Sequence, residues 1–310
     1  LRVEQGEAAA VPVVRRRDRH ERDGNTFVAE SDESDRSLLY LKPLAAVVTN
    51  VEFDHPDFYT SLDEVFSIFE KFVQSVPPTG HLVICADDPN CLRLAALSPC
   101  PVTTYGLLAG DLRAEILSPS SYTLFEGGEE RGAVELRVAG RHNVLNSLAA
   151  AGVARWLGHD AYAAAVSLKD FSGVRRRFQL KGERGEIRIV DDYAHHPTEL
   201  SVTLEVAQAT RSEDGRVIAV FQPHRYSRTR ALYREFGEAL TLADAVLVTD
   251  VYGAGEMPEP GVSGKLVVDA VCESPVSPGS RPEVYYIPDQ RDIPGVLRKV
   301  AEPRDTVLTT

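Results

Sequence analysis

The chain has 310 residues, a formal net charge of -12 and an isoelectric point of about 5.2. Such an acidic balance argues against general binding to nucleic acids or anionic membranes, because both need a basic protein surface. Hydrophobic residues make up 43% of the sequence, which is ordinary for a globular protein, and the length predicts two domains.

The cysteines and the lengths of the apolar runs bear on the cellular compartment of the protein. The four cysteines never have the C-x-x-C spacing of zinc sites and redox motifs, and scattered free thiols are typical of a reducing cytoplasm. No apolar run approaches the ~20 residues that span a bilayer. The N-terminus also lacks the charged-then-apolar pattern of a signal peptide. We therefore expect a cytoplasmic protein.

The first 23 residues differ in composition from the rest. Between residues 15 and 23, five arginines crowd together with three acidic residues, and no helical or strand period is sustained. This pattern predicts an irregular, solvated or disordered arm. Because the chain begins with Leu1 and not with Met, we also expect that a segment precedes it.

From Thr26 the pattern becomes that of a globular domain. Strands are predicted at residues 26–29, 45–49 and 81–85. An apolar stripe at helical spacing predicts a helix over 62–76, with Ser61 as its N-cap and Glu64 as the capping-box partner. Further elements are expected as several strands within 102–138 and helices at 143–157 and 160–168.

A regular alternation of strands and helices begins near residues 172–181. Strands are predicted at 187–190, 217–221, 245–249, 284–286 and 306–308, with helices between them. This alternation is typical of parallel βαβ units with right-handed crossovers. We therefore predict an α/β protein with the arm at 1–23, one domain at 24–176 and a second at 177–310.

Polar clusters follow two strands of the first domain. Residues 30–35 hold four carboxylates, the hard oxygen ligands that Mg²⁺ prefers, although an acidic run is more often a solvated turn. Residues 49–55 bring Asn, Glu, Asp and His side chains to the end of a buried strand. Ligands bind at such strand ends in α/β folds. A loop with satisfied side chains is the alternative there.

Two further clusters lie near the domain boundary. Asn143 and Asn146 are three residues apart and share one face of a predicted helix. Their amides could bind adenine, or Asn143 could cap the helix. Residues 175–177 are three arginines, whose guanidinium groups suit phosphate, and a basic linker is the alternative.

The last two clusters follow strands of the second domain and lead into helices. Residues 191–199 contain two aspartates and two histidines. Residues 221–229 bring His224, Arg225 and Arg228 to a helix N-terminus, which favours anionic groups such as carboxylate or phosphate. A purely structural role is the alternative for both clusters.

These six clusters, in this order, resemble the Mur ligase family from about residue 24 onwards. The Gly-x-His-Asn-x-x-Asn motif at 140–146 is shared by the wider family. Residues 191–199 and 221–229 are most similar to the member that adds L-alanine to UDP-N-acetylmuramate. The resemblance implies a partial central ATP-binding domain with a mixed sheet, and a C-terminal Rossmann-like domain. It also implies ATP and Mg²⁺ as cofactors, and an acyl phosphate made on the way to a peptidoglycan precursor.

The resemblance implies roles for single residues. The implied magnesium ligands are Glu30 and His55. The residues implied to contact ATP are His142, Asn143 and Asn146 at adenine, Arg177 at the phosphates and Asp192 at the ribose. The residues implied to line the substrate and amino-acid site are Tyr193, His195, His224, Arg225 and Arg228. Among all of these, the expected catalytic residues are His195, Asp192 and Arg228.

The sequence departs from the family in one respect that bears on activity. The family's Gly-rich phosphate loop, which ends in Gly-Lys-Thr or Gly-Lys-Ser, has no match in this chain, and neither does its UDP-binding domain. Gly264-Lys265 is followed by Leu266 and lacks the hydroxyl that such a loop supplies, so we reject it. We also interpret 306–308 as a final strand without the turn and helix that usually follow.

We therefore expect an incomplete copy of the ligase that releases little or no phosphate from ATP by itself. Two alternatives stay open. One is the related ligase that recycles murein tripeptides, against which residues 224–228 weigh. The other is a non-catalytic remnant that binds the nucleotide or the precursor.

Overall fold

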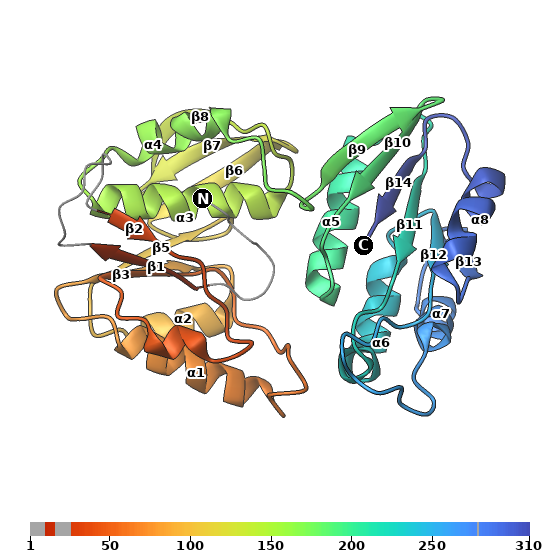
Figure 1. Cartoon of the computed structure of the whole chain (residues 1–310). Coiled ribbons are helices and arrows are strands. Elements are labelled where there is room, and N and C mark those ends of the chain that lie inside the picture. The colour runs from red at the N-terminus through yellow and green to blue at the C-terminus, as the bar shows by residue number, and fades with distance from the viewer. Residues whose placement is uncertain (1–9, 16–25, 278) are drawn as a thin grey trace. The chain divides into compact units, whose positions relative to one another are not determined.

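The computed structural model describes residues 10–15, 26–277 and 279–310. Contacts within the chain divide it into two units, Leu1–Ser172 and Gly173–Thr310, which we call unit 1 and unit 2 (Figure 1). The division falls four residues before the boundary predicted at 176/177.

Strand β1 (Ala10–Arg15) lies where the sequence predicts an irregular arm. It pairs antiparallel with both β2 (Thr26–Val28) and β3 (Ala45–Val48). The prediction is wrong for this segment, because backbone hydrogen bonds to two neighbouring strands order it without a regular side-chain period. The rest of the predicted arm, residues 1–9 and 16–23, lies outside the described residues.

Unit 1 is built on an eight-stranded sheet in the order β2-β1-β3-β4-β5-β6-β7-β8. Its further strands are β4 (His81–Cys85), β5 (Val102–Gly106), β6 (Leu112–Ser118), β7 (Ser121–Glu126) and β8 (Glu129–Glu135). The run from β3 to β6 is parallel, and β6 to β8 is antiparallel. Because β2 and β3 both oppose β1, they point the same way as β4, and their carboxyl ends share one edge.

Helices cover both faces of this sheet. Figure 1 shows α1 (Leu62–Gln74) and α2 (Pro89–Ala95) on one face, and α3 (Arg141–Trp156) and α4 (Ala161–Ser167) on the other. Two short 3₁₀ helices complete the unit, η1 (Ser37–Tyr40) and η2 (Leu168–Asp170). Helix α3 lies so close to the sheet that a Cβ added at Gly152 would come within 2.9 Å of the Val83 side chain.

The cap of α1 differs in one detail from the predicted capping box. The Ser61 hydroxyl accepts from the Glu64 N–H at 3.4 Å, as predicted. The Glu64 carboxylate, however, accepts from the Thr60 N–H at 2.7 Å, one residue before the N-cap. A box closes only if the carboxylate returns to the N-cap itself, and the extended backbone at Ser61 directs it one residue further.

Unit 2 has a six-stranded sheet in the order β13-β12-β11-β14-β10-β9. Its strands are β9 (Gln179–Arg184), β10 (Ile187–Asp191), β11 (Val217–Phe221), β12 (Ala245–Val248), β13 (Glu283–Tyr286) and β14 (Thr306–Thr309). All except β9 are parallel, which confirms the predicted α/β fold. The antiparallel β9 was not predicted, because it is largely exposed and shows no apolar alternation.

The helices of unit 2 are α5 (Pro197–Thr210), α6 (Tyr226–Leu240), α7 (Gly264–Glu273) and α8 (Ile293–Val300), with the short η3 (Gln290–Asp292) before α8. On one face of the sheet, Phe221 packs against Phe236 of α6 with ring centroids 5.0 Å apart. On the other face, Ile293 of α8 joins a cluster with Ile218 and Val220. Both faces of β11 are therefore buried, as its continuous apolar sequence predicts.

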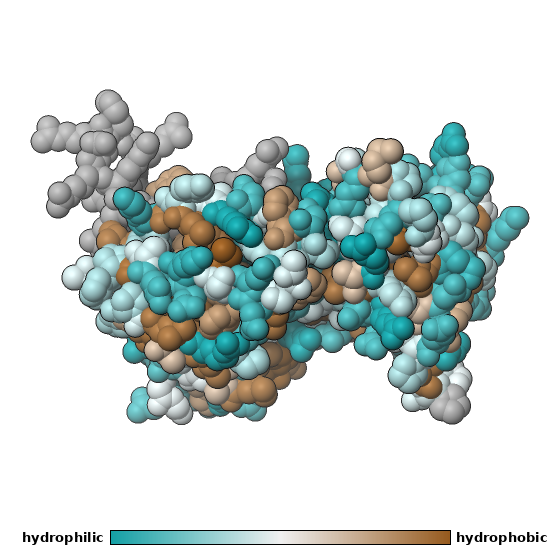
Figure 2. All heavy atoms as spheres, turned by 90° about the horizontal axis from the view of Figure 1, so that it is seen from below, coloured by the Kyte–Doolittle hydropathy of each residue, from teal (hydrophilic) through white to brown (hydrophobic). Residues whose placement is uncertain are grey.

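Within the described ranges, no helix is long and apolar enough to cross a bilayer. On the face seen in Figure 2, apolar residues occur in separate groups among polar ones.

Two glycines near helix starts in unit 2 should respond oppositely to a methyl group. A Cβ at Gly264 would lie 1.8 Å from the Thr249 carbonyl oxygen, whereas nothing lies within 4 Å of one at Gly295. We predict that Gly264→Ala lowers the free energy of unfolding by about 1–3 kcal/mol through overpacking. Gly295→Ala should raise it by about 0.4–1 kcal/mol, because it restricts the unfolded chain. Urea denaturation followed by circular dichroism measures both, and equal midpoints would contradict the prediction.

Candidate active site

The loops that follow β2 and β3 meet at the carboxyl edge of unit 1. The buried Tyr59 hydroxyl donates to the Glu33 carbonyl oxygen at 2.6 Å. The same tyrosine donates its N–H to the carbonyl oxygen of His55 at 2.9 Å. Tyr59 thus joins the loop that carries Glu30 to the loop that carries His55, the two predicted magnesium ligands.

The backbone of His55 has a conformation that residues other than glycine rarely adopt. Its φ is 53°, in the left-handed region, and only 5% of its surface is exposed. Its N–H donates to a carboxylate oxygen of Asp54 at 2.7 Å, and its Nε2 lies 3.7 Å from the other oxygen. Backbone strain of this kind persists where the surrounding structure enforces it, and it clusters at functional sites.

A carboxylate from the next loop fixes the backbone just before His55. One oxygen of Asp88 accepts from the Val51 N–H at 3.0 Å, and the Asn90 amide donates to the Val51 carbonyl at 3.1 Å. The other oxygen of Asp88 caps α2 by accepting from Asn90 and Cys91. No local pattern indicates this contact, because Asp88 reaches a loop 37 residues earlier in the chain.

The two predicted magnesium ligands, Glu30 and His55, lie on neighbouring loops at this edge. Among the residues that the structure describes, no three His, Cys, Asp or Glu side chains are grouped so that they could hold a metal ion. Mg²⁺ uses one or two carboxylates and takes its remaining ligands from phosphates and water. Binding of Mg²⁺ by Glu30 and His55 stays a prediction.

The first turn of α3 carries the residues predicted to contact adenine. Gly140, at φ 111°, is the N-cap, so the alternative that Asn143 caps the helix is wrong. The Asn143 side-chain amide instead donates to the Ala139 carbonyl at 2.8 Å. His142 and Asn146 are half-buried on this turn. Their contact with adenine stays a prediction.

Asp192 closes the end of β10 in unit 2. Only 5% of its surface is exposed, and its two oxygens accept the backbone N–H groups of Phe178 at 2.7 Å and Ala194 at 2.8 Å. Burial raises the pKa of Asp192, against the lowering effect of these N–H groups and of Arg177. The carboxylate therefore ties the segment entering unit 2 to the loop after β10.

Glu199 is a junction that sequence reasoning missed. One of its oxygens accepts from the His195 N–H at 2.9 Å and the His196 N–H at 3.2 Å, which closes a capping box at α5. The other oxygen lies 3.3 Å from the Arg177 guanidinium. A box with histidine as N-cap departs from the usual Ser or Thr pattern, so the spacing alone did not indicate it.

A row of aromatic rings crosses three loops at the carboxyl edge of unit 2. Ring centroids are 5.2 Å apart for Tyr193 and His195, 6.1 Å for His195 and His224, and 5.7 Å for His224 and Tyr252. Arg176 lies over the Tyr193 ring at 4.4 Å. The loops after β10, β11 and β12 thus present one continuous surface.

Positive charge gathers beneath this row. Arg228 is 2% exposed, and its guanidinium lies 3.4 Å from Nδ1 of His224. Burial, followed by the charges of Arg228, His195 and Arg225, lowers the pKa of His224 to about 4. Arg225 has φ 69° and begins α6 without a side-chain cap. The site therefore holds arginines together with an imidazole that stays neutral near pH 7.

The predicted residues fall into three groups. Those expected at the substrate site lie along the carboxyl edge of unit 2: Tyr193, His195, His224, Arg225 and Arg228. Arg177 and Asp192 belong to the same unit, beside Glu199. Glu30, His55 and the residues on α3 belong to unit 1. Besides Glu199, sequence reasoning missed Tyr252 and Glu256, which follow β12 and contact the loop after β11.

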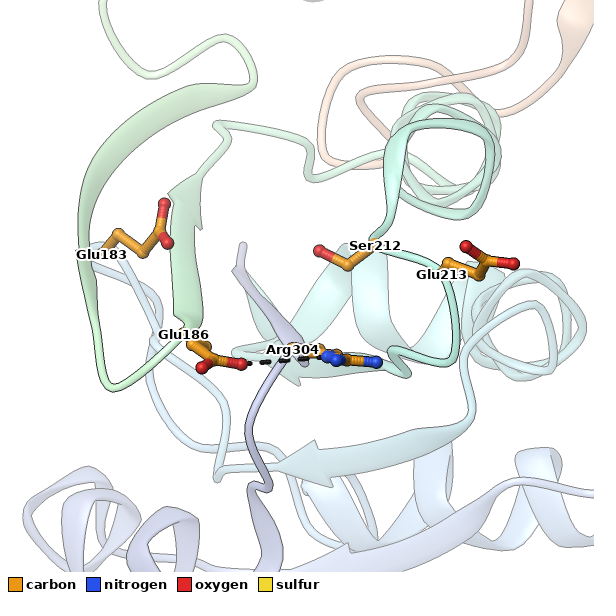
Figure 3. Close-up of a pocket in the computed structure, with 5 residues that line it drawn as sticks. All are labelled: Glu183, Glu186, Ser212, Glu213 and Arg304. Carbon is orange, nitrogen blue, oxygen red and sulfur yellow. Dashed lines mark ion pairs between the residues drawn. The ribbon is translucent and has the colours of Figure 1, made fainter.

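A pocket in unit 2 lies away from these residues, at the amino-terminal edge of the sheet (Figure 3). It is lined by Glu183, Glu186, Ser212, Glu213 and Arg304. Arg304 pairs with Glu186 at 3.8 Å, and both side chains are more than half exposed. The pocket offers solvated charges that already pair with each other, and no buried polar group.

The fold and the edge of unit 2 define an α/β protein with arginine and histidine side chains after the ends of parallel strands. Two models of one family match this chain, the Mur ligase middle domain over residues 16–154 and the Mur ligase, glutamate ligase domain over residues 176–310. The chain belongs to the Mur ligase family.

Two relatives that share one name match most of the chain. It is 69% identical over 283 residues to a UDP-N-acetylmuramate–L-alanine ligase of Rubrobacter xylanophilus, covering 91% of this chain and 62% of that protein. A ligase of the same name from Kineococcus radiotolerans is 47% identical over 296 residues, covering 93% and 61%. The chain thus spans about 62% of the length of the relatives it matches.

Solved structures agree with the fold. UDP-N-acetylmuramate–alanine ligase MurC from Thermotoga maritima matches with a TM-score of 0.69 at 29% identity, covering 90% of this chain and 58% of that one. A murein peptide ligase from Psychrobacter arcticus has a TM-score of 0.61 at 24% identity, covering 88% and 55%. Thermotoga maritima MurF, solved with ADP, has a TM-score of 0.64 at 20% identity, covering 86% and 58%. The last two show likeness of fold only.

The lowered pKa of His224 should appear in the pH dependence of stability. A folded-state pKa of about 4, against 6.5 for an unperturbed histidine, means that the unfolded chain binds the proton more readily. The stabilisation is present above pH 6.5 and is lost as the pH falls towards 4. We predict that His224→Gln loses less stability than the wild type between about pH 7 and about pH 5. Urea midpoints measure this, with His159→Gln on the surface of unit 1 as control, and an unchanged pH dependence in His224→Gln would contradict it.

Proposed function

We propose that the chain carries the nucleotide-binding and amino-acid-adding parts of a UDP-N-acetylmuramate–L-alanine ligase. The observation that carries this proposal is the 69% identity to the Rubrobacter xylanophilus ligase over 91% of the chain. The cationic edge of unit 2 supports it, because the muramate carboxylate and its acyl phosphate are both anions. The free thiols of Cys85, Cys91 and Cys100, all buried, suit the cytoplasm as its compartment.

Asn146 is the residue of α3 best placed to contact adenine. The amide of Asn143 already donates to the Ala139 carbonyl, so less of its bonding capacity is left for a base. In unit 2, Arg177 would bind the ATP phosphates while Glu199 orients its guanidinium. Asp192 would accept from the ribose through lone pairs that Phe178 and Ala194 do not use.

Mg²⁺ would be held by Glu30 and His55 together with phosphate oxygens. When bound, the ion offsets charge on the phosphates as the phosphoryl group is transferred. The protein's own contribution is to fix the two ligand loops, through the Tyr59 hydroxyl on one side and Asp88 on the other. Both contacts are made by side chains that bond the backbone, so they hold without the ion.

Arg225 and Arg228 would offset the negative charge of the carboxylate and of the tetrahedral intermediate that forms when the alanine amine attacks. His224 can donate a hydrogen bond there, but with a pKa of about 4 it is a poor proton acceptor near pH 7. It therefore adds polarity to the site without a further charge.

His195 is the better proton acceptor for the incoming ammonium group. Its Nδ1 lies 2.8 Å from the Tyr193 carbonyl oxygen, which can only accept, so Nδ1 carries the hydrogen and Nε2 is the basic atom. The Glu199 carboxylate, 3.5 Å from Nδ1, would stabilise the imidazolium once the proton arrives. This division of roles matches a base that is oriented by an adjacent carboxylate.

A chimera tests the proposed reaction. Residues 24–310 would replace the matching part of the Rubrobacter xylanophilus ligase. We expect phosphate release from ATP that requires UDP-N-acetylmuramate, L-alanine and Mg²⁺ together, and little or none from the 310-residue chain alone. Glu30→Gln in the chimera should raise the Mg²⁺ concentration needed for half the maximal rate.

Other outcomes of this experiment would count against the proposal. Release that requires a murein tripeptide in place of L-alanine would favour the recycling ligase. A folded chimera that binds ATP but turns over with neither acceptor would favour the non-catalytic alternative.

The role of His195 can be tested in the same chimera. We predict that His195→Gln lowers kcat about 100-fold or more, the usual contribution of a positioned general base. The KM for ATP should change little, because His195 faces the row of rings at the substrate edge. Steady-state kinetics measure both constants, with His159→Gln as the matched control. A kcat within twofold of the control would exclude His195 as the base.

A further inference from the structure

The loop after β12 is attached to the loop after β11 beyond the ends of the two strands. The Arg225 N–H donates to the Tyr252 carbonyl at 2.8 Å, and the Tyr252 N–H donates to the Pro223 carbonyl at 2.9 Å. These bonds form a parallel bridge between His224 and Tyr252, whose rings also lie together. The backbone that carries His224 and Arg225 is therefore bound along one side.

Glu256, four residues further along this loop, binds the start of α6. One carboxylate oxygen accepts from the Ser227 hydroxyl at 2.5 Å, and the other accepts from the Ser227 N–H at 3.0 Å. The Arg225 guanidinium lies 3.9 Å from the first oxygen. Burial raises the pKa of Glu256, but the hydrogen bonds from Ser227 and the charge of Arg225 more than offset this, so the pKa stays below its usual range.

Glu256 supplies the hydrogen-bond acceptor at the start of α6 that the N-cap residue does not supply. The first N–H groups of a helix need partners outside it, and an N-cap side chain normally provides one. Arg225 occupies the N-cap position with φ 69° and makes no side-chain cap. A residue other than glycine in that region is strained and persists only when its surroundings hold it. The bond to Tyr252 and the carboxylate of Glu256 are two contacts that hold it.

We propose that Glu256 is a positioning residue for the anion-binding site. It does not touch the substrate. It fixes the backbone at residues 224–227 and pairs with the Arg225 guanidinium, so that this guanidinium meets the acidic group of the substrate from a fixed position. The proposal rests on the proposed function, because it needs an anionic substrate at this edge of unit 2.

The contact between Glu256 and the start of α6 can be tested in the 310-residue chain without any substrate. Glu256→Ala should accelerate hydrogen exchange of the backbone amides at 226–229, because the Ser227 N–H loses its acceptor. Glu256→Gln keeps a side-chain oxygen and should have a smaller effect. Glu259→Gln is the matched control, since Glu259 lies on the same loop and pairs with an exposed arginine, Arg230, at 2.7 Å. Unchanged exchange in Glu256→Ala would overturn the proposal.

The positioning role is tested in the active chimera. Glu256→Ala should lower kcat/KM for UDP-N-acetylmuramate by about 10- to 100-fold, the range expected when hydrogen bonds to a charged group are lost. Glu256→Gln should fall between Glu256→Ala and the wild type, and Glu259→Gln should match the wild type. The KM for ATP should stay within about twofold. A double-mutant cycle with Ser227→Ala should be non-additive, because the two side chains share one contact.

The outcomes separate this proposal from the proposed function. A chimera that is inactive before any Glu256 substitution overturns the proposed function, and the positioning role with it. An active chimera in which both Glu256 variants keep wild-type kcat/KM overturns only the positioning role. So does an equal rise of KM for ATP and for UDP-N-acetylmuramate, since a general loss of structure would produce that result. If Glu256→Ala does not fold, the nearly isosteric Glu256→Gln decides.

Discussion

Parallel strands end together, and the backbone of every loop that follows them must find hydrogen-bond partners where the sheet no longer provides any. In this protein single carboxylates supply many of those partners. Asp88 accepts from the loop after β3, Asp192 from the segment that enters unit 2, and Glu256 from the start of α6. Each joins backbone segments that are distant in sequence. Because proposed site residues sit on these segments, the carboxylates set the spacing of those residues as well as the stability of the loops.

Backbone strain marks the same places. Positive φ angles occur at His55, one of the two proposed metal ligands, at Arg176 and Phe178 on either side of Arg177, and at Arg225. A left-handed conformation costs about 1–3 kcal/mol for a residue other than glycine. It is tolerated here because neighbouring contacts over-determine each segment, such as the bond from Phe178 to Asp192 and the bond from Arg225 to Tyr252.

Much of the fold could be predicted because its strands are buried and therefore apolar throughout. Residues 45–48 and 217–221 show this directly. Helices such as α1 could be predicted from apolar residues at the 3.6-residue period. Prediction failed where the sequence shows no regular apolar period although the backbone pairs with neighbouring strands, as in β1 and β9. It also missed that β14, the last strand in the sequence, lies between β10 and β11. Sheet order depends on packing between distant elements, which no local pattern records.

The sequence by itself determined which residue types stand at the strand ends, because each polar cluster directly follows an apolar run, and it determined the family through those clusters. Only the tertiary structure decided which clusters meet. It brought His195, His224 and Tyr252 into one row, and it placed the carboxylate of Glu256 on Ser227, 29 residues earlier in the chain. Such contacts depend on the order and register of strands. Those are fixed by hydrogen bonds across the whole sheet and not by the residues adjacent in sequence.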